Sequence, residues 1–385
     1  MAKFLASLLI TFSLVFGLKA QSLKPFTERV NIQTECASPH QILNKEWVAV
    51  GIHHPYNLMI DSILLWQGKP SFRFELGTED NTLLGYQAGT TKGRIELSHC
   101  FAQKSDFKRF SDSVSLQAKE SKSVYFYGQT IYPQGSSGKF EFSIFLPSDF
   151  PNDASCIFAQ WHGMPFSRLV KFPNGEVQQL SAQEFSTLLS QMIFKKEQGF
   201  TKIPIVDKNG KSKFDSEGNP RFKAGTPNGY QVEQGGFPPL TFGFSNGYFY
   251  IKANSDAAWF SDKTDRTNAN VAKLNVLESV KSRYKVSTLA YKMPIAEFPK
   301  NQWVTFKVDL AWSTYSPSQE KMLKNGFLDV EMQSFNQRKY IVKRLSLPMG
   351  RNDEQGYYFK FGIYRVGNST TPVYYNLAGY SEKIN

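Results

Sequence analysis

The chain has 385 residues, with 45 Lys or Arg against 33 Asp or Glu, and a formal net charge of +12 at pH 7. A basic excess of this size attracts polyanions, so nucleic acid, anionic lipid and sulfated or carboxylated polysaccharide are the partner classes to consider. The three cysteines, Cys36, Cys100 and Cys156, form no CxxC pair and allow at most one disulfide, which excludes a fold built on disulfides.

Residues 1–20 have the pattern of a secretory signal peptide. Lys3 supplies the positive charge, Phe4 to Leu18 form the apolar core, and Ala20 precedes the expected cleavage point. No later stretch approaches the ~20 continuous apolar residues of a membrane span. We therefore expect an exported protein, periplasmic in a Gram-negative bacterium or secreted, that does not insert into a membrane. Loss of Lys3 and Lys19 leaves a net charge of +10, and export argues against nucleic acid as the partner.

The mature chain, residues 21–385, is predicted to be a single all-β domain, an antiparallel sandwich. Aromatic residues make up 15% of the sequence, and many segments alternate or are rich in β-branched and aromatic side chains. Asn246-Gly247 is a hairpin signal. The predicted strands are 71–76, 93–99, 123–132, 139–147, 156–163, 240–254, 287–295, 303–313, 327–335 and 356–367. Strands this numerous, with almost no helix between them, favour a sandwich over a parallel α/β sheet.

Residues 166–232 interrupt the strand pattern. Ser181 and Glu184 form a capping box, and the apolar residues after it have helical spacing. A polar segment rich in lysine and glycine follows the helix. We interpret the region as a basic thumb outside the sandwich; the alternative is a solvated loop without a role.

One predicted strand carries the most informative side chains. Strand residues alternate between faces, so Tyr358, Lys360, Gly362 and Tyr364 share one side of segment 357–365, and the apolar residues between them share the other. Two phenols and a cation, with a glycine that leaves space, suit a sugar polyanion. The alternative is a half-exposed strand that the tyrosines merely cover.

Two other segments offer chemistry. His162 follows Gln160 in Phe158–Gly163, where Phe158, Gln160 and His162 are expected on one face; an imidazole there can transfer a proton or be structural. Lys92, Arg94 and Glu96 share a strand face, and arginine binds carboxylate or sulfate through a planar fork of donors.

The sequence has no GxSxG, no HExxH and no phosphate-binding glycine loop. No pair of carboxylates for glycoside hydrolysis stands out, although inspection does not exclude one. Asn352-Asp353-Glu354 could bind a hard cation through oxygen atoms or form a simple turn.

Read together, several segments resemble the heparin lyase I (heparinase I) family, polysaccharide lyase family thirteen. The similarity runs in the same order from about residue 29 to the end of the chain. The matching segments are Arg29–Gln33, Trp47–Gly51, Thr90–Arg94, Gln134–Ser137, Ile157–Gly163, Val232–Gly236, Tyr250–Asp256, Gly350–Asp353, Gly356–Ser369 and Leu377–Tyr380.

The resemblance implies a β-jelly roll with a protruding thumb, one structural calcium ion, and cleavage of heparin or highly sulfated heparan sulfate by β-elimination. The cleaved bond joins glucosamine to a uronic acid, and the product ends in a 4,5-unsaturated uronate. The implied calcium ligands are Glu233, Trp259, Asn352 and Asp353. The implied substrate groove is formed by Gln33, Lys92, Arg94, Tyr358 and Lys360, with thumb lysines Lys195, Lys196 and Lys202.

For this elimination we expect His162 to be the general base and Tyr364 the general acid. The sequence departs from the family at two points. Tyr132 or Pro133 stands where some members have a reactive cysteine, so a cysteine mechanism is not supported, and Phe200 stands where a thumb histidine is expected.

Two other functions remain open from the residues alone: a non-catalytic jelly roll that binds sulfated glycan, and a glycoside hydrolase. A binding protein needs aromatic platforms but no acid–base pair, so His162 and Tyr364 favour the lyase. We expect a monomer.

Overall fold

The computed structural model describes most of the chain. The described residues are 40–42, 47–52, 54–80, 93–99, 132–165, 169–171, 177–179, 181, 183–184, 201–204, 213–214, 222–225, 230–231, 237–258, 277–281, 285–316, 319–352, 354–365 and 369–385. Among them, no helix is long and apolar enough to cross a bilayer.

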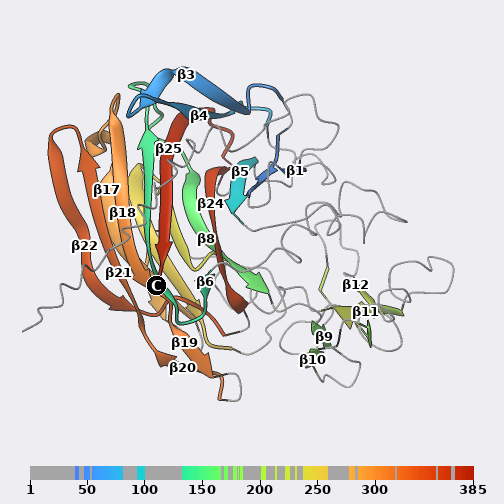
Figure 1. The fold of residues 1–385 in the computed structure, drawn as a ribbon. Coiled ribbons are helices and arrows are strands. Elements are labelled where there is room, and N and C mark those ends of the chain that lie inside the picture. The colour runs from blue at the N-terminus through green and yellow to red at the C-terminus, as the bar shows by residue number, and fades with distance from the viewer. Residues whose placement is uncertain are drawn as a thin grey trace, which may run out of the picture.

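The described strands form two large sheets packed face to face (Figure 1). The main path of the first sheet runs β1-β2-β5-β24-β8-β14-β15-β17-β16, with β6 beside β24 and β23 beside β15. Its eleven strands are β1 (His40–Ile42), β2 (Trp47–Val50), β5 (Arg94–His99), β6 (Tyr132–Pro133), β8 (Cys156–Pro165), β14 (Leu240–Ser245), β15 (Tyr248–Asp256), β16 (Val280–Lys281), β17 (Lys285–Pro294), β23 (Gly350–Arg351) and β24 (Glu354–Arg365).

The second sheet runs β22-β21-β18-β7-β25-β4-β3. Its seven described strands are β3 (Leu58–Trp66), β4 (Lys69–Leu76), β7 (Ser137–Phe145), β18 (Trp303–Ala311), β21 (Gly326–Ser334), β22 (Gln337–Leu347) and β25 (Val373–Ile384). A hairpin of β19 (Thr314–Ser316) and β20 (Lys321–Lys324) and a short 3₁₀ helix, η3 (Ile295–Glu297), complete this part of the chain. The predicted all-β jelly-roll sandwich is confirmed.

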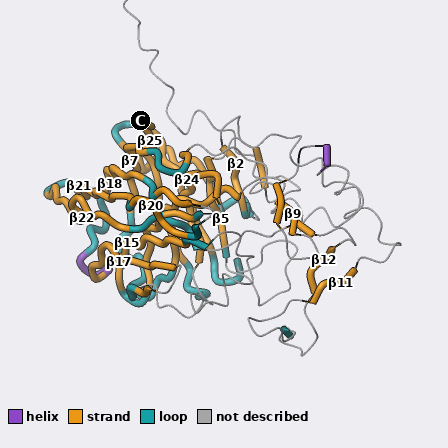
Figure 2. Tube along the Cα trace, turned by 90° about the horizontal axis from the view of Figure 1, so that it is seen from below, coloured by secondary structure: helices purple, strands orange, loops and turns teal. Residues whose placement is uncertain are grey.

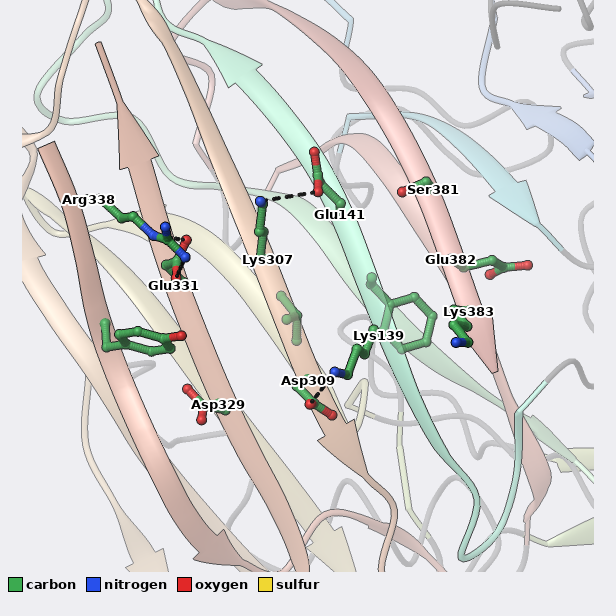
Figure 3. Close-up of a pocket in the computed structure, with 13 residues that line it drawn as sticks. Lys139, Glu141, Lys307, Asp309, Asp329, Glu331, Arg338, Ser381, Glu382 and Lys383 are labelled. Atoms are coloured by element: carbon green, nitrogen blue, oxygen red, sulfur yellow. Dashed lines mark hydrogen bonds and ion pairs between the residues drawn. The ribbon is translucent and has the colours of Figure 1, made fainter. Parts of the chain in front are cut away.

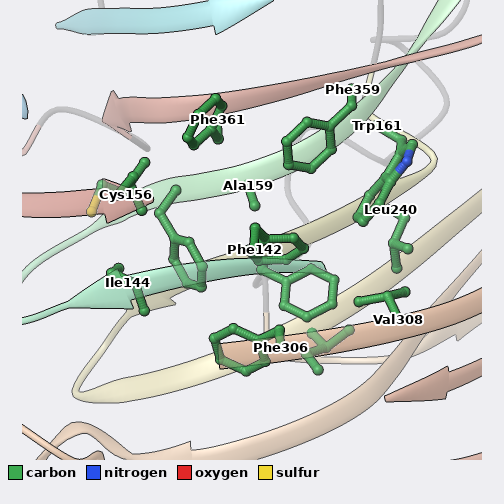
Figure 4. Packing of buried hydrophobic residues seen from close by; sticks show 14 of the residues in the cluster. Phe142, Ile144, Cys156, Ala159, Trp161, Leu240, Phe306, Val308, Phe359 and Phe361 are labelled. Carbon is green, nitrogen blue, oxygen red and sulfur yellow. The ribbon is translucent and has the colours of Figure 1, made fainter. Parts of the chain in front are cut away.

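The space between the sheets is filled by phenylalanine rings. Phe142 of β7 lies at the centre, with ring centroids 5.5 Å from Phe242, 5.6 Å from Phe306 and 5.5 Å from Phe359 (Figure 4). Burial of a phenylalanine side chain contributes roughly 1.5–3 kcal/mol. This aromatic core fixes the first sheet, and the site on it, against the second.

The hairpin predicted at Asn246-Gly247 joins β14 to β15, and both turn residues have positive φ, +49° and +80°. Asparagine and glycine tolerate that conformation best. Sequence reasoning missed β22, because Arg338, Lys339, Lys343 and Arg344 are exposed and two bulges break its alternation. Charges and bulges are common on such edge strands.

Strands from the predicted thumb form two small sheets of their own. Within the described residues, β9 (Leu169–Lys171) pairs with β10 (Val177–Gln179) and β13 (Tyr230–Gln231), and β11 (Thr201–Pro204) pairs with β12 (Phe222–Gly225). Figure 2 shows β9, β11 and β12 apart from the gathered strands of the sandwich. Ser181 and Glu184 exchange the two bonds of a capping box. The extent of the thumb, residues 166–232, stays a prediction.

Candidate active site

The side chains of β24 alternate as predicted. Phe359, Phe361 and Ile363 belong to the hydrophobic core (Figure 4), while Tyr358 and Lys360 lie outside that cluster, on the opposite face of the sheet. We call this opposite face the site face. Tyr358 and Lys360 are nevertheless almost fully buried. They therefore form the floor of any site on this face.

The interpretation of β8 was right for two residues and wrong for one. Gln160 and His162 are directed to the site face, but Phe158 packs in the core together with Ala159 and Trp161. The cause is a β-bulge: the register between β8 and β14 shifts at this point, so two successive residues of β8 turn to the same side. No sequence pattern marks this bulge.

Cross-strand pairing brings most of the described candidates together. Directly opposite residues on neighbouring strands lie about 4.5–5.5 Å apart at Cβ. The pairs are His162 with Tyr358, Gln160 with Lys360, and Arg94 with Tyr364. Five candidates from three separate sequence segments, and Gln160 with them, therefore share one face.

A single carboxylate links three of these side chains. Oε2 of Glu96 lies 2.6 Å from Nζ of Lys360 and 3.1 Å from Nε of Arg94, and Oε1 accepts a hydrogen bond from Nε2 of Gln160. The Glu96 and Lys360 side chains are 2% and 1% exposed, and the Arg94 side chain is 19% exposed. We call these four residues the Glu96 cluster. It joins β5, β24 and β8 on the site face.

Arg94 contacts Tyr364 and acts electrostatically on His162, the two residues expected to transfer protons. Its guanidinium carbon is 4.2 Å from the ring centroid of Tyr364, and its charge also reaches His162, where it helps lower the pKa. The ring of His162 is 5.6 Å from that of Tyr358. Tyr364 is six residues further along β24, after the register shift between Phe361 and Tyr364. The phenol directly across from His162 is thus Tyr358.

His162 is held as a neutral base. Its Nδ1 is 3.0 Å from the carbonyl oxygen of Gly163, and because a carbonyl only accepts, Nδ1 carries the proton and Nε2 keeps its lone pair. Burial, and then the positive charge of Lys360, hold the pKa of His162 well below its usual value. Nε2 can therefore accept a proton at neutral pH.

Two glycines are required by close packing. A Cβ on Gly362, whose φ is +144°, would lie 2.2 Å from the carbonyl oxygen of Ile95, so this glycine allows β24 to approach β5. The expectation that Gly362 opens space for a ligand was wrong for that reason. A Cβ on Gly163 would collide with the side chain of Glu354 at 1.8 Å.

Sequence reasoning left out three residues of this face. It placed Glu96 and Gln160 on the right side of their strands without giving them a role. Lys252 of β15 was not singled out; it pairs with Thr241, which pairs with Gln160, so it lies in the same transverse row. Burial lowers the pKa of Lys252 to about 8. The sequence signal that could have identified Lys252 is a lysine within a strand that is otherwise rich in aromatic residues.

Several predicted site residues lie outside the described residues. They are Gln33, Lys92, Lys195, Lys196, Glu233, Trp259 and Asp353. Lys202 belongs to β11, whose pairing is described but whose side chains are not. The roles of these residues stay predictions.

Asn352 is the described member of the predicted calcium site. It is buried, and its Nδ2 donates to the carbonyl oxygens of Ala257 at 2.8 Å and Ser316 at 3.0 Å. Its Oδ1 is buried without a hydrogen-bond partner in the described structure. A buried oxygen without a donor is costly, and a cation satisfies it. The described residues contain no cluster of three acidic, His or Cys side chains.

Tyr132 is one of the two residues, with Pro133, at the place where some members of the family are expected to carry a reactive cysteine. It is buried, its hydroxyl is 3.0 Å from that of Tyr380, and it donates to Glu382. Burial and the Glu382 charge raise the pKa of Tyr132 well above its usual value. Cys156 is a buried free thiol whose pKa is raised to about 12 by burial. Neither residue is prepared to act as a nucleophile.

A charged depression of about 370 Å³ lies on the second sheet (Figure 3). Its lining alternates in sign: Lys139 is 3.6 Å from Asp309, and Lys307 is 3.8 Å from Glu141. Exposed ion pairs of this kind contribute little to stability. The depression contains none of the predicted catalytic residues.

Comparison with known proteins identifies the family of the chain. A family model described as polysaccharide lyase matches residues 43–377. Heparin lyase I of Pedobacter heparinus is 52% identical over 358 residues, which cover 92% of this chain and 91% of the relative. The alginate lyase vAL-1 from Chlorella virus has a TM-score of 0.35 and 8% identity, covering 85% of this chain and 89% of its own. Alginate lyase AlyC3 has a TM-score of 0.33 and 10% identity, covering 82% and 75%.

The family expected from the sequence motifs is thus confirmed over most of the chain. The matched region contains the strands β5, β8 and β24 and with them the Glu96 cluster, His162 and Tyr364. The chain belongs to the polysaccharide lyase family.

Proposed function

We propose that the protein is a heparin lyase that cleaves heparin and highly sulfated heparan sulfate at glucosamine-(1→4)-uronic acid linkages by β-elimination. The observation that carries the substrate class is the 52% identity to heparin lyase I of Pedobacter heparinus over 92% of the chain. The net charge of +12 suits a sulfated polyanion.

The reaction removes the weakly acidic proton at C5 of the uronate and expels the glycosidic oxygen from C4. The site must neutralise the uronate carboxylate, accept the C5 proton and protonate the leaving oxygen. Arg94 and Lys360 supply fixed positive charge on the site face, and we assign them, with Gln33 and Lys92, to the carboxylate and sulfate groups.

His162 is the proposed general base, because its Nδ1 faces the carbonyl oxygen of Gly163 and burial, followed by the charge of Lys360, lowers its pKa, so that the ring is neutral at neutral pH. Tyr364 is the proposed general acid, and the guanidinium of Arg94 on its ring is a stabilising contact for a phenol that gives up a proton. Because C5 and C4 are adjacent carbons, both side chains must reach the same uronate residue, which we place over Arg94 and Lys360.

One calcium ion is proposed as a structural component, held by Glu233, Trp259, Asn352 and Asp353. The support is Oδ1 of Asn352, a buried oxygen without a donor in the described structure. The ion would satisfy this oxygen and fix the turn that leads into β24. Residues 1–20 are proposed to direct export to the periplasm or beyond, and the protein is proposed to act as a monomer.

The direct test is the ultraviolet absorbance of the unsaturated uronate on incubation with heparin, because bound or hydrolysed sugar does not absorb there. His162→Ala should abolish product formation while heparin binding, measured by calorimetry, persists. His54→Ala, an exposed histidine next to Asp80, is the control. An undiminished rate in His162→Ala would refute the role of the base, and a wild-type protein that releases no unsaturated product from heparin would refute the proposed substrate.

A further inference from the structure

We propose that Glu96 is a positioning residue for the elimination: its carboxylate holds Arg94 and Lys360 in place and sets the net charge of the floor of the site. The inference rests on the proposed function, since Arg94 and Lys360 are the groups assigned to the substrate. Glu96 itself does not touch the substrate in this proposal.

The geometry that supports the proposal is the convergence of three strands on one carboxylate. Glu96 lies on β5, Lys360 on β24 and Gln160 on β8, and all three side chains are buried. Lys360 and Arg94 both contact Oε2, at 2.6 and 3.1 Å, and Gln160 donates to Oε1. A carboxylate engaged at both oxygens fixes the rotamers of the groups around it.

The contact continues from the cluster to the proposed acid. Nε of Arg94 forms an ion pair with Oε2 of Glu96 at 3.1 Å, and the guanidinium carbon of the same side chain lies 4.2 Å from the ring centroid of Tyr364. Glu96 therefore orients Tyr364 through one intermediate residue. Misplacement of a catalytic group by about 1 Å can cost on the order of 10²-fold in rate.

The charges lead to a second consequence. The two cations beside one anion give the Glu96 cluster one net positive charge, which can face one anionic group of the substrate. Without Glu96 the floor would carry two positive charges and bind the anionic ground state more strongly. Tighter ground-state binding lowers KM without accelerating the reaction.

The chain offers a matched control on the opposite sheet. Glu331 of β21 is also buried, its oxygens contact Nε and Nη2 of Arg338 at 2.8 and 2.9 Å, and Gln333 donates to it. Glu331 thus also binds an arginine and a glutamine, although among the described residues no contact with a lysine corresponds to that of Lys360, and it lines the depression of the second sheet (Figure 3). Glu331→Gln should therefore report the structural cost of losing such a carboxylate.

The experiment compares Glu96→Gln, Glu96→Asp and Glu331→Gln with the wild type by kcat, KM, the salt dependence of KM and the melting temperature. Glu96→Gln should lower kcat by roughly tenfold to 10²-fold, with KM unchanged or lower, and steepen the slope of log KM against log salt by up to about one unit. Glu96→Asp should keep the wild-type salt slope, because the charge is retained, and lose part of kcat. Glu331→Gln should keep the kcat and salt slope of the wild type.

Arg94→Lys provides a second route if Glu96→Gln does not fold, because it removes the Nε contact from the more exposed side. In a double-mutant cycle, the effects of Glu96→Asp and Arg94→Lys on kcat should be non-additive, whereas those of Glu331→Gln and Arg94→Lys should add. Additive effects in the first cycle would overturn the proposal. So would wild-type kcat in Glu96→Gln, or a loss that follows the melting temperature with an unchanged salt slope.

The result for the substrate is separate. Rates are measured on heparin, heparan sulfate and alginate. If the wild-type protein cleaves alginate but neither heparin nor heparan sulfate, the proposed substrate is refuted. The Glu96 variants would then be compared with the wild type on alginate, with the same expected changes in kcat, KM and salt slope.

Discussion

At the scale of single residues, burial determines which side chains of the site face can react. His162 is half-buried, with its Nδ1 beside the carbonyl oxygen of Gly163, whereas Tyr358 next to it is fully buried. Tyr364, in contrast, is only half-buried. This difference in exposure is the reason to assign the acid to Tyr364 although Tyr358 lies closer to His162.

Tyr364→Phe should reduce kcat by on the order of 10²-fold or more, because a proton donor is lost. Tyr358→Phe is the matched comparison, since it removes the phenol directly across from His162. We expect a smaller loss of kcat there. Steady-state rates and melting temperatures of both variants decide the assignment: an active Tyr364→Phe together with an inactive, stably folded Tyr358→Phe would transfer the role of the acid to Tyr358.

We expect Lys252 to contribute to substrate binding and to lower the stability of the folded protein. Burial disfavours its charged form, so its pKa falls from 10.5 in the unfolded chain to about 8. The penalty on folding is therefore present in full below pH 8 and disappears above pH 10.5. Lys252→Met should raise the melting temperature at pH 7, with a gain that shrinks as the pH rises above 8, and should also raise KM. A lower melting temperature at pH 7 would contradict this.

At the scale of secondary-structure elements, bulges and crossovers build the site. The bulge in β8 turns Phe158 into the core and leaves Gln160 and His162 on the site face. β24 pairs with β5 on one side and with β8 on the other, and both of these strands are about 200 or more residues away from it in the sequence. Neither feature follows from local periodicity, because both depend on which strands become neighbours.

The thumb is the element on which affinity is predicted to depend. Reversing the charges of Lys195, Lys196 and Lys202 together should flatten the dependence of heparin affinity on salt, since each sulfate contact releases counterions. KM should rise more than kcat falls. Calorimetric titrations at several salt concentrations test this, with reversal of the exposed Lys321 and Lys324 of β20 as a control. An equal slope in wild type and thumb variant would indicate a solvated face.

At the scale of the whole molecule, the two sheets and the proposed calcium ion support the site together. The main chain of Asn352 donates to Asp256 at 2.9 Å, and its side chain contacts Ala257 and Ser316, so the turn before β24 is tied to the ends of β15 and β19. An ion at Oδ1 of Asn352 would add a tie to Glu233, at the end of the thumb.

Removal of calcium should therefore lower the melting temperature, because a ligand of the folded state stabilises it by roughly 2.7 kcal/mol at a hundredfold excess over Kd. Activity should fall in parallel as β24 loses its support. Asp353→Ala should have the same effect and then be insensitive to chelation, which calorimetry with and without chelator can show. If chelated protein keeps both its melting temperature and its rate, the calcium proposal is wrong.

The sequence by itself determined the all-β class, the hairpin at Asn246-Gly247, the faces of β24 and the family. These features are local or depend on ordered motifs: alternation with period two, turn residues that tolerate positive φ, and matching segments along the chain. The tertiary structure alone decided that Glu96 binds Lys360 and Arg94, that Phe158 is in the core, that Gly362 serves strand packing and that Lys252 joins the row of Gln160. Each of these features depends on which strands become neighbours in the sheet and on how deeply the neighbouring strands bury a side chain. Neither can be predicted from the sequence of a single strand.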